Sequence, residues 1–260
     1  MIFIDTHTHL YLDEFRTDID EVIRRSVDKG VQYMLIPNID ESSAGDMHRL
    51  CDSFPENCFP MMGIHPTSVK ENYKDELAAI EKHLKTRKYV AIGEIGIDLY
   101  WDKTHLKEQE EAFRFQLDLA HEQKLPVVIH SRNSLEIVFK ILEDYKNKGI
   151  TGVFHCFPGS YEQSKKAINM GYYLGLGGVV TYNKSAMADV AAHAPLDSII
   201  LETDAPFLTP YPYRGKRNES AFIVEIAEKI AEIRDIPVDE VARVTTQNAI
   251  NLFKMNNFQV

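Results

Sequence analysis

Short apolar runs recur along the chain, and the stretches between them have apolar residues at helical spacing. The runs are rich in β-branched residues, which is typical of strands buried on both faces of a parallel sheet. We expect strands at Ile2–Asp5, Val31–Pro37, Cys58–Ile64, Tyr89–Glu94, Pro126–His130, Gly152–His155, Tyr172–Gly175 and Ser198–Leu201.

The segments between the strands predict helices. In Leu106–Gln123, residues Phe113, Leu117 and Ala120 share one helical face. A second helix is expected after Asn133, and two more at Phe222–Ile233 and, after Pro237, at Val238–Phe253. Eight strands that alternate with helices predict an α/β fold, most simply a single (β/α)8 TIM barrel that spans residues 1–260. An open doubly wound sheet is the alternative, but no glycine fingerprint for a dinucleotide follows the first strand.

Composition supports one folded domain and narrows the function classes. The 260 residues are 44% hydrophobic, enough for a large core, and no change in composition marks a domain boundary. A net charge of −10 argues against broad coating of nucleic acid but allows a local basic patch. Cys51, Cys58 and Cys156 are odd in number and lack zinc-motif spacing, so no disulfide framework is expected. No membrane-spanning stretch and no signal peptide are recognisable, which predicts a cytoplasmic protein.

The chain opens with "MIFIDTHTHL", in which two histidines follow an apolar run. Side chains alternate between the two faces of a strand, so His7 and His9 are expected to point the same way. Two adjacent imidazoles are typical of a metal site. The alternative is one histidine bonded to the backbone in the core and one in solvent.

A barrel makes this choice testable, because functional residues collect at the carboxyl ends of its strands. Six of the eight expected strands end in His, Asp or Glu. The stretches are Asp5-Thr-His7-Thr-His9, Gly63-Ile-His65-Pro66, Gly93-Glu94-Ile-Gly96, His130-Ser131-Arg132, His155-Cys156-Phe157 and Glu202-Thr-Asp204-Ala-Pro206. Each residue alone could be structural. Together they predict a metal site in one cup.

The motifs "DTHTHL", "GIHP", "GEIGID", "VIHSR", "FHCFPGS", "ETDAPFLTP" and "RGKRN" resemble the TatD family of metal-dependent deoxyribonucleases, within the amidohydrolase-like barrels. The resemblance runs from Asp5 to the closing "NAINLF". Many amidohydrolases bridge two metals with a carboxylated lysine, but no lysine occupies such a strand end here. A glutamate takes that position in TatD-like proteins, and Glu94 matches it.

We expect two divalent ions, Mg²⁺, Mn²⁺ or Zn²⁺. His7, His9 and Asp204 suit one ion, His130 and His155 suit the second, and Glu94 can bridge both through its two oxygens. The resemblance implies that Asp204 also accepts a proton from the attacking water, so Glu94 and Asp204 are the expected catalytic residues. Glu202, two residues before Asp204, is interpreted as a ligand, as a support for one, or as part of a salt bridge.

Substrate contacts are expected from cationic donors near the metals. Arg132 can form a planar fork to phosphate oxygens, and His65 can donate a further bond. The stretch "YPYRGKRN" holds Arg214, Lys216 and Arg217 beside tyrosines, which suits a single nucleic-acid strand, although it can equally be a solvated loop. Tyr100 and Trp101 are a further candidate for base stacking, or they cap the barrel.

Three functions fit these features. The first is a metal-dependent phosphodiesterase, a 3′–5′ exodeoxyribonuclease acting on single-stranded DNA ends, whose polarity the resemblance alone supplies. The alternative is a metal-dependent hydrolase of small esters, lactones or amides, including aminoacyl-ester editing. A zinc-stabilised binding protein is the third, and the open set of nitrogen and oxygen ligands argues against it. The sequence leaves the oligomeric state undetermined.

Overall fold

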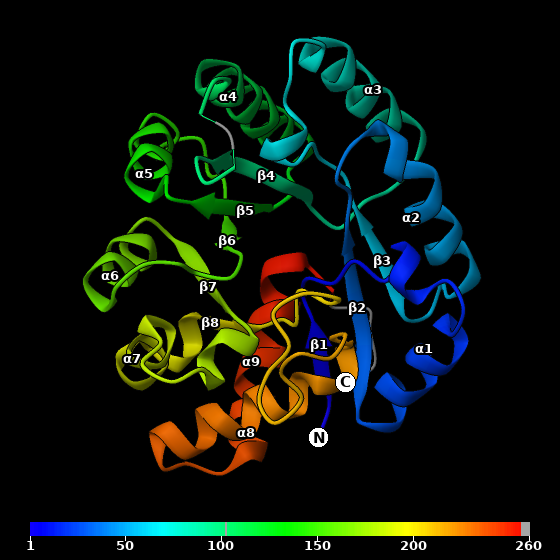
Figure 1. Ribbon diagram of the computed structural model, residues 1–260. Coiled ribbons are helices and arrows are strands. Elements are labelled where there is room, and N and C mark those ends of the chain that lie inside the picture. The colour runs from blue at the N-terminus through cyan, green and yellow to red at the C-terminus, as the bar shows by residue number, and fades with distance from the viewer. Residues whose placement is uncertain (102, 256–260) are drawn as a thin grey trace.

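The computed structural model describes residues 1–101 and 103–255, in which parallel strands alternate with helices (Figure 1). The strands are β1 (Phe3–Asp5), β2 (Val31–Pro37), β3 (Cys58–Met61), β4 (Ile92–Asp98), β5 (Val127–Arg132), β6 (Gly152–Phe154), β7 (Tyr172–Leu176) and β8 (Ile199–Leu201). The α-helices are α1 (Ile19–Asp28), α2 (Glu41–Ser53), α3 (Tyr73–Thr86), α4 (Leu106–Gln123), α5 (Leu135–Glu143), α6 (Tyr161–Asn169), α7 (Ala186–His193), α8 (Ile223–Arg234) and α9 (Val238–Phe253).

The strands form two parallel sheets in chain order, β1-β2-β3 and β4-β5-β6-β7-β8. Isolated parallel bridges join the sheets at both seams, Met62 with Ile92 and Thr8 with Ala205. The amide of Thr6 also donates to the carbonyl oxygen of Leu201, which ties β1 to β8. This order, with helices outside the strands, confirms the predicted (β/α)8 barrel class.

A compact apolar cluster fills the barrel interior. Ile4, Val128, Val153 and Ile200 come from four strands and pack with the last helix, α9. That helix contributes Ala249, Ile250, Leu252 and Phe253 to the cluster. Because α9 covers this end of the barrel, a site is expected at the other end, where the strands finish at their carboxyl termini. We call that end the mouth.

The predicted strands are present, but the bounds of two differ by three residues or more from those expected. The strand expected at Tyr89–Glu94 begins at Ile92 and continues to Asp98. It is extended because it pairs with β5 as far as Asp98 with Arg132. Cys58–Ile64 was too long by comparison, since β3 ends at Met61. The helices predicted at Leu106–Gln123 and Val238–Phe253 have the predicted bounds.

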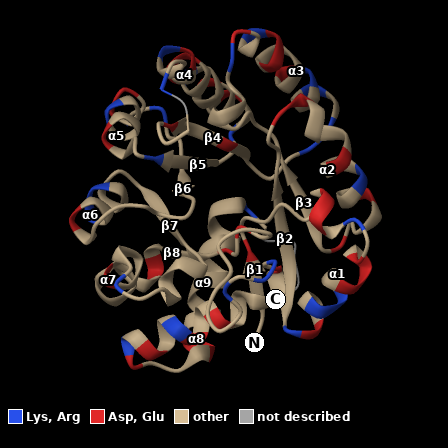
Figure 2. Ribbon diagram, in the orientation of Figure 1, with Lys and Arg blue, Asp and Glu red and all other residues tan. Residues whose placement is uncertain are grey.

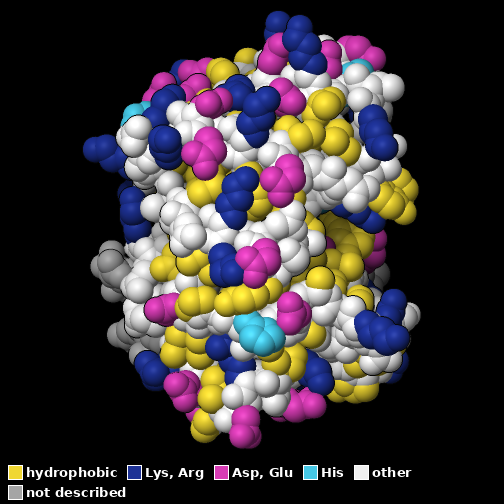
Figure 3. Space-filling view, turned by 90° about the vertical axis from the view of Figure 1, so that its left-hand side faces the viewer, with side chains coloured by type: hydrophobic (Ala, Val, Ile, Leu, Met, Phe, Trp, Pro, Cys, Tyr) yellow, Lys and Arg dark blue, Asp and Glu magenta, His cyan; other side chains and the backbone are white. Residues whose placement is uncertain are grey.

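Charged side chains lie mostly on the helices and loops (Figure 2). On the face formed by α5, α6 and α7, lysines and arginines alternate with acidic residues (Figure 3). Lys166 lies 3.5 Å from Glu136 there, for example. Cys51, Cys58 and Cys156 are free thiols. Among the described helices, none is both long and apolar enough to cross a membrane.

Candidate metal centre

The period of two along each strand places the candidate ligands directly above the apolar interior. Val128 on β5 belongs to the interior cluster, and His130 follows two residues later on the same face. Val153 and His155 repeat this relation at β6, as do Ile200 and Glu202 at β8. On each of these three strands, an apolar residue of the interior is therefore followed two positions later by a polar side chain of the candidate site, His130, His155 or Glu202.

The backbone around Glu94 fits closely against β5. Gly96, on β4, has a φ of +140°, and a Cβ atom at this position would lie 2.0 Å from the carbonyl oxygen of His130. Only glycine permits both that conformation and that approach. The "GEIGID" motif thus brings Glu94 and His130 onto adjacent strands at close range.

Glu94 lies at the centre of the site and faces a different group of histidines with each oxygen. Its Oε2 lies 3.1 Å from Nε2 of His7 and 3.7 Å from Nε2 of His9. Its Oε1 lies 2.9 Å from Nδ1 of His130 and 3.8 Å from Nε2 of His155. A carboxylate placed in this way can bridge two ions, as the sequence predicts for Glu94.

His65 lies closer to the ligands than its predicted role in substrate binding requires. Its Nε2 is 3.5 Å from Oε1 of Glu94 and 3.3 Å from Nδ1 of His130. Its Nδ1 is 2.6 Å from the hydroxyl of Thr67, which helps to fix the ring. The three side chains His65, Glu94 and His130 are therefore a ligand-type group in their own right.

Asp98 is a site residue that the sequence analysis missed. Its Oδ2 lies 2.8 Å from Nε2 of His130, so His130 is held between Asp98 and Glu94. A carboxylate on the second nitrogen of a ligating histidine fixes the orientation of the ring. The "GEIGID" motif contains the information needed to find Asp98, because Glu94, Gly96 and Asp98 share one strand face. The sequence analysis ended the strand at Glu94 and so did not place Asp98 on that face.

Asp204 completes the cluster from the segment after β8. Its Oδ1 lies 3.6 Å from Nε2 of His9 and 3.8 Å from Nε2 of His155. The rings of His7 and His155 stack with their centroids 3.5 Å apart. Oε1 of Glu202 lies 2.9 Å from the other nitrogen of His155, Nδ1, and accepts a hydrogen bond from the amide of Cys156. This geometry favours a role for Glu202 in supporting His155.

Burial and mutual charge shift the pKa values of these groups. Burial would raise the pKa of Glu94, but His7, His65, His155 and the bond to His130 hold it well below its usual range. Burial would lower the pKa of His130, but its bonds to Asp98 and Glu94 raise it to about 9. Burial raises the pKa of Asp204 to about 7, with a contribution from nearby Glu94 and Glu202. The protonation of each group in the cluster therefore depends on the charge of the others.

The residues present fit divalent metal ions. Three groups of side chains bring their ligand atoms within 4.8 Å of one another: His7, His9 and Glu94; His65, Glu94 and His130; and His7, His155 and Asp204. Buried, mutually facing imidazoles and carboxylates are costly without a cation to compensate them. The Nδ1 atom of His7 is also buried without a hydrogen-bond partner among the described residues. The mixed nitrogen and oxygen donors suit a catalytic rather than a closed structural site.

Two arginines of the predicted substrate set lie on aromatic rings near the mouth. The guanidinium of Arg132 lies 3.8 Å from the ring centroid of Tyr100, and that of Arg214 lies 4.2 Å from that of Tyr182. Neither has an ion-pair partner within the described part of the chain. Both positive charges therefore remain available to an anionic ligand.

The other two cations predicted to bind substrate differ from each other. Lys216 lies 5.8 Å from the ring of Tyr213 and forms no ion pair with a described residue. Arg217 instead binds Asp18, with Nη1 and Nη2 each 2.7 Å from a carboxylate oxygen. The structure thus favours a structural role for Arg217, in fastening this loop to the start of α1.

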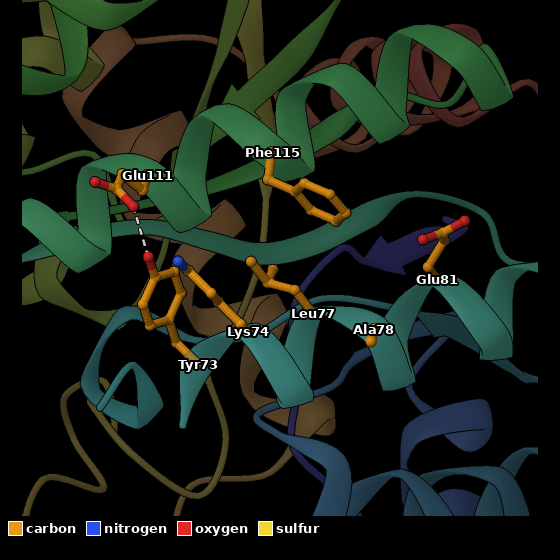
Figure 4. A pocket seen from close by; sticks show the side chains of 7 residues that line it. All are labelled: Tyr73, Lys74, Leu77, Ala78, Glu81, Glu111 and Phe115. Carbon is orange, nitrogen blue, oxygen red and sulfur yellow. Dashed lines mark hydrogen bonds between the residues drawn. The ribbon is translucent and has the colours of Figure 1, made fainter. Parts of the chain in front are cut away.

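A cavity of about 390 Å³ lies elsewhere, between α3 and α4. Tyr73 and Leu77 line it from α3, and Phe115 faces them from α4, while the hydroxyl of Tyr73 donates to Glu111 (Figure 4). None of the predicted site residues lines this cavity. The three groups of candidate ligands lie at the mouth instead.

Comparison with known proteins identifies the family of the chain. The family described as "TatD related DNase" matches residues 4–254. The chain is 37% identical to the uncharacterized metal-dependent hydrolase YabD of Bacillus subtilis, over 98% of this chain and 100% of that protein. It is 30% identical to the uncharacterized metal-dependent hydrolase YcfH of Escherichia coli, over 98% and 97% of the two chains.

Comparison with solved structures indicates the same family. The crystal structure of YjjV, a TatD homologue from Escherichia coli, superposes with a TM-score of 0.91 at 30% identity and covers 97% of this chain and 98% of that one. A TatD family hydrolase from Entamoeba histolytica shares the fold, with a TM-score of 0.83 at 24% identity, over 97% and 98% of the two chains. The converging ligands and these relationships establish that the chain belongs to the TatD family of metal-dependent hydrolases.

Proposed function

We propose that the protein is a metal-dependent phosphodiesterase, a 3′–5′ exodeoxyribonuclease that acts on single-stranded DNA ends. The observation that carries the proposal is the position of Glu94, whose two oxygens face separate histidine groups. On the neighbouring strand, Arg132 lies over the ring of Tyr100 and has no ion-pair partner among the described residues. Two ions held side by side suit the in-line displacement of a phosphodiester. The 3′ polarity comes from the family resemblance.

Each ligand has a distinct place in this proposal. His7, His9 and Asp204 would hold one divalent ion, and His130 and His155 would hold the second. His65 lies close enough to Glu94 and His130 to contribute a further ligand. Bound ions would polarise the phosphate and supply an activated water at neutral pH. Asp98 and Glu202 fix the rings of His130 and His155 through their other nitrogens.

The remaining roles belong to side chains near the mouth. Asp204 is the group we assign to accept the proton of the attacking water, because its Oδ1 faces His9 and His155 while part of its side chain is open to solvent. Arg132 would bind the non-bridging phosphate oxygens through its planar fork. Arg214 and Lys216 would contact the backbone of the strand as it enters.

A substrate panel with Mg²⁺, Mn²⁺ or Zn²⁺ tests the reaction class. We expect cleavage of single-stranded DNA and of a chromogenic phosphodiester, with slower cleavage of duplex DNA. RNA, esters and lactones are the comparison substrates. Hydrolysis of esters or lactones with no cleavage of any phosphodiester would overturn the proposal in favour of a small-molecule hydrolase.

A second experiment tests the mode of attack. Linear single-stranded DNA with a 5′ label is compared with a covalently closed circle of the same sequence. We expect a ladder of single-nucleotide steps that shortens from the 3′ end, with the circle spared. Rapid cutting of the circle would indicate an endonuclease.

A further inference from the structure

The only tryptophan in the chain lies exposed near the mouth. Trp101 is 71% exposed, although tryptophan side chains are usually well buried. Tyr100 beside it is 53% exposed, and the two rings meet edge to face with their centroids 4.9 Å apart. Two adjacent large aromatic side chains in solvent indicate a binding surface. We call Tyr100, Trp101 and Arg132 the aromatic platform.

The platform is fastened to the metal centre through a single carboxylate. Oδ1 of Asp98 accepts bonds from the backbone amides of Tyr100 and Trp101, at 2.8 and 3.3 Å. Oδ2 of the same side chain lies 2.8 Å from Nε2 of His130. Asp98 is therefore a positioning residue for both, and the aromatic pair has a fixed relation to the candidate ligand His130.

Arg132 joins the platform from the neighbouring strand. It pairs with Asp98 across β4 and β5, and its carbonyl oxygen accepts a bond from the amide of Leu99 at 2.9 Å. Its guanidinium lies 3.8 Å from the ring centroid of Tyr100 and 5.5 Å from that of Trp101. A fork for phosphate and a ring surface for a base thus stand side by side, which are the two requirements for binding one nucleotide of a single strand.

We propose that Tyr100 and Trp101 stack a base of single-stranded DNA next to the phosphate at the metal centre, while Arg132 contacts the backbone. This rests on the proposed function and adds a base contact to it. A base inside a duplex is already paired and stacked, so only an unpaired or frayed strand can use the platform. The platform thereby supplies a reason for a preference for single strands.

Trp101 itself provides the first measurement, because its fluorescence has no other tryptophan background. The metal-loaded protein is titrated with a phosphorothioate-linked single-stranded oligonucleotide, chosen to slow cleavage, and binding is followed in parallel by anisotropy of a label. We expect quenching that saturates together with the anisotropy. An abasic oligonucleotide with the same backbone should quench much less. Equal quenching by both, or saturated binding without quenching, would overturn the proposal.

Variants provide the second measurement. Trp101→Ala should raise KM for single-stranded DNA by about five- to a hundredfold, the usual effect of losing one stacked base. Trp101→Phe should retain most of the affinity because it keeps an aromatic face. The matched control is Phe115→Ala, which removes a partly exposed aromatic side chain on α4 and should leave KM unchanged. Unchanged KM in Trp101→Ala would also overturn the proposal.

The chromogenic phosphodiester separates this inference from the proposed function. It lacks neighbouring bases, so Trp101→Ala should cleave it at the wild-type rate. If the wild type cleaves both substrates but Trp101 affects neither, the stacking proposal fails and the phosphodiesterase proposal stands. If no phosphodiester is cleaved although oligonucleotides quench Trp101, the stacking surface stands and the proposed reaction fails.

Discussion

Glu94 is the residue on which both halves of the candidate centre depend. Its oxygens lie 3.1 Å from His7 and 2.9 Å from His130, side chains that come from different sheets. Removing a terminal imidazole weakens one half, whereas removing Glu94 leaves both groups of histidines without their shared carboxylate. Replacing Glu94 should therefore reduce metal binding and turnover more than replacing any single histidine.

This gives a prediction for metal content and turnover. Glu94→Ala should lose most bound metal and at least about a hundredfold in turnover; His7→Ala, His155→Ala and Asp204→Ala should each lose turnover severely. Elemental analysis and a cleavage assay measure both quantities, and chelator should abolish wild-type activity. His193→Ala is the control, since that histidine is exposed on α7 and bonds to the carbonyl oxygen of Asp189. Full activity of folded Glu94→Ala protein in chelator would contradict the prediction.

Arg132 gives a prediction that separates phosphate binding from metal binding. Arg132→Ala should slow phosphodiester cleavage by about ten- to a hundredfold, because a charge-assisted bond contributes roughly 1.5–3 kcal/mol. Metal content should not change, since Arg132 is not in any of the three ligand groups. Arg132→Lys should recover part of the rate, because it keeps the charge but not the fork.

An uncharged ester is the comparison substrate for Arg132→Ala if the protein hydrolyses one. A loss that is confined to the phosphodiester assigns the side chain to the phosphate. An equal loss on both substrates would instead indicate that Arg132 has a structural role in the aromatic platform.

At the scale of elements, the alternation of strands and helices was predictable because each buried strand needs its own apolar run. The candidate metal ligands were predictable for a related reason, because they lie just past those apolar runs, where the strands end. The extent of β4 did not follow, because it depends on pairing with Val127–Arg132, which lies far along the chain. That error concealed Asp98. The ion pair of Arg217 with Asp18 was equally hidden, because it joins segments almost two hundred residues apart.

The Arg217–Asp18 contact predicts a pH-dependent contribution to stability. The hydrogen bond from Arg217 lowers the pKa of Asp18 below its usual value. A carboxylate with a depressed pKa stabilises the fold above its unfolded pKa, and this stability is lost as the pH falls through the folded value. Asp18→Asn should therefore lower the free energy of unfolding at pH 7 by up to about 1 kcal/mol.

Chemical denaturation at pH 7 and at pH 3 checks this contribution. The difference between wild type and Asp18→Asn should narrow at the lower pH. A double-mutant cycle with Arg217→Met isolates the pair, because Asp18 also lies 3.4 Å from Arg25. A difference that stays constant over this pH range, or a coupling of zero in the cycle, would show that the ion pair contributes nothing.

At the scale of the whole molecule, the charge distribution limits where DNA can bind. The chain carries a net charge of −10, and the face of α5, α6 and α7 mixes both signs (Figure 3). Attraction for a DNA backbone should therefore come from the cations near the mouth that lack ion-pair partners among the described residues. Arg132, Arg214 and Lys216 meet this condition, whereas Arg217 is neutralised by Asp18.

Reversing two of these charges tests the idea. Arg214→Glu combined with Lys216→Glu should weaken processing of single-stranded DNA and flatten its salt dependence. Each lost phosphate contact reduces the logarithmic salt slope by about 0.7 for a single strand, because fewer counterions are released on binding. Rates measured across a series of salt concentrations give the slope. The chromogenic phosphodiester should be cleaved at nearly the wild-type rate, because it is too small to contact Arg214 or Lys216.

The matched control carries the same change in net charge on the outer surface. Lys140→Glu with Lys146→Glu alters two exposed lysines, one on α5 and one in the turn after it. If global charge governs binding, both double variants will weaken DNA processing alike and shift the slope equally. If the cations near the mouth govern binding, only the variant at Arg214 and Lys216 will weaken DNA processing and flatten the salt dependence. An unchanged slope in that variant would mean that the strand enters along another route.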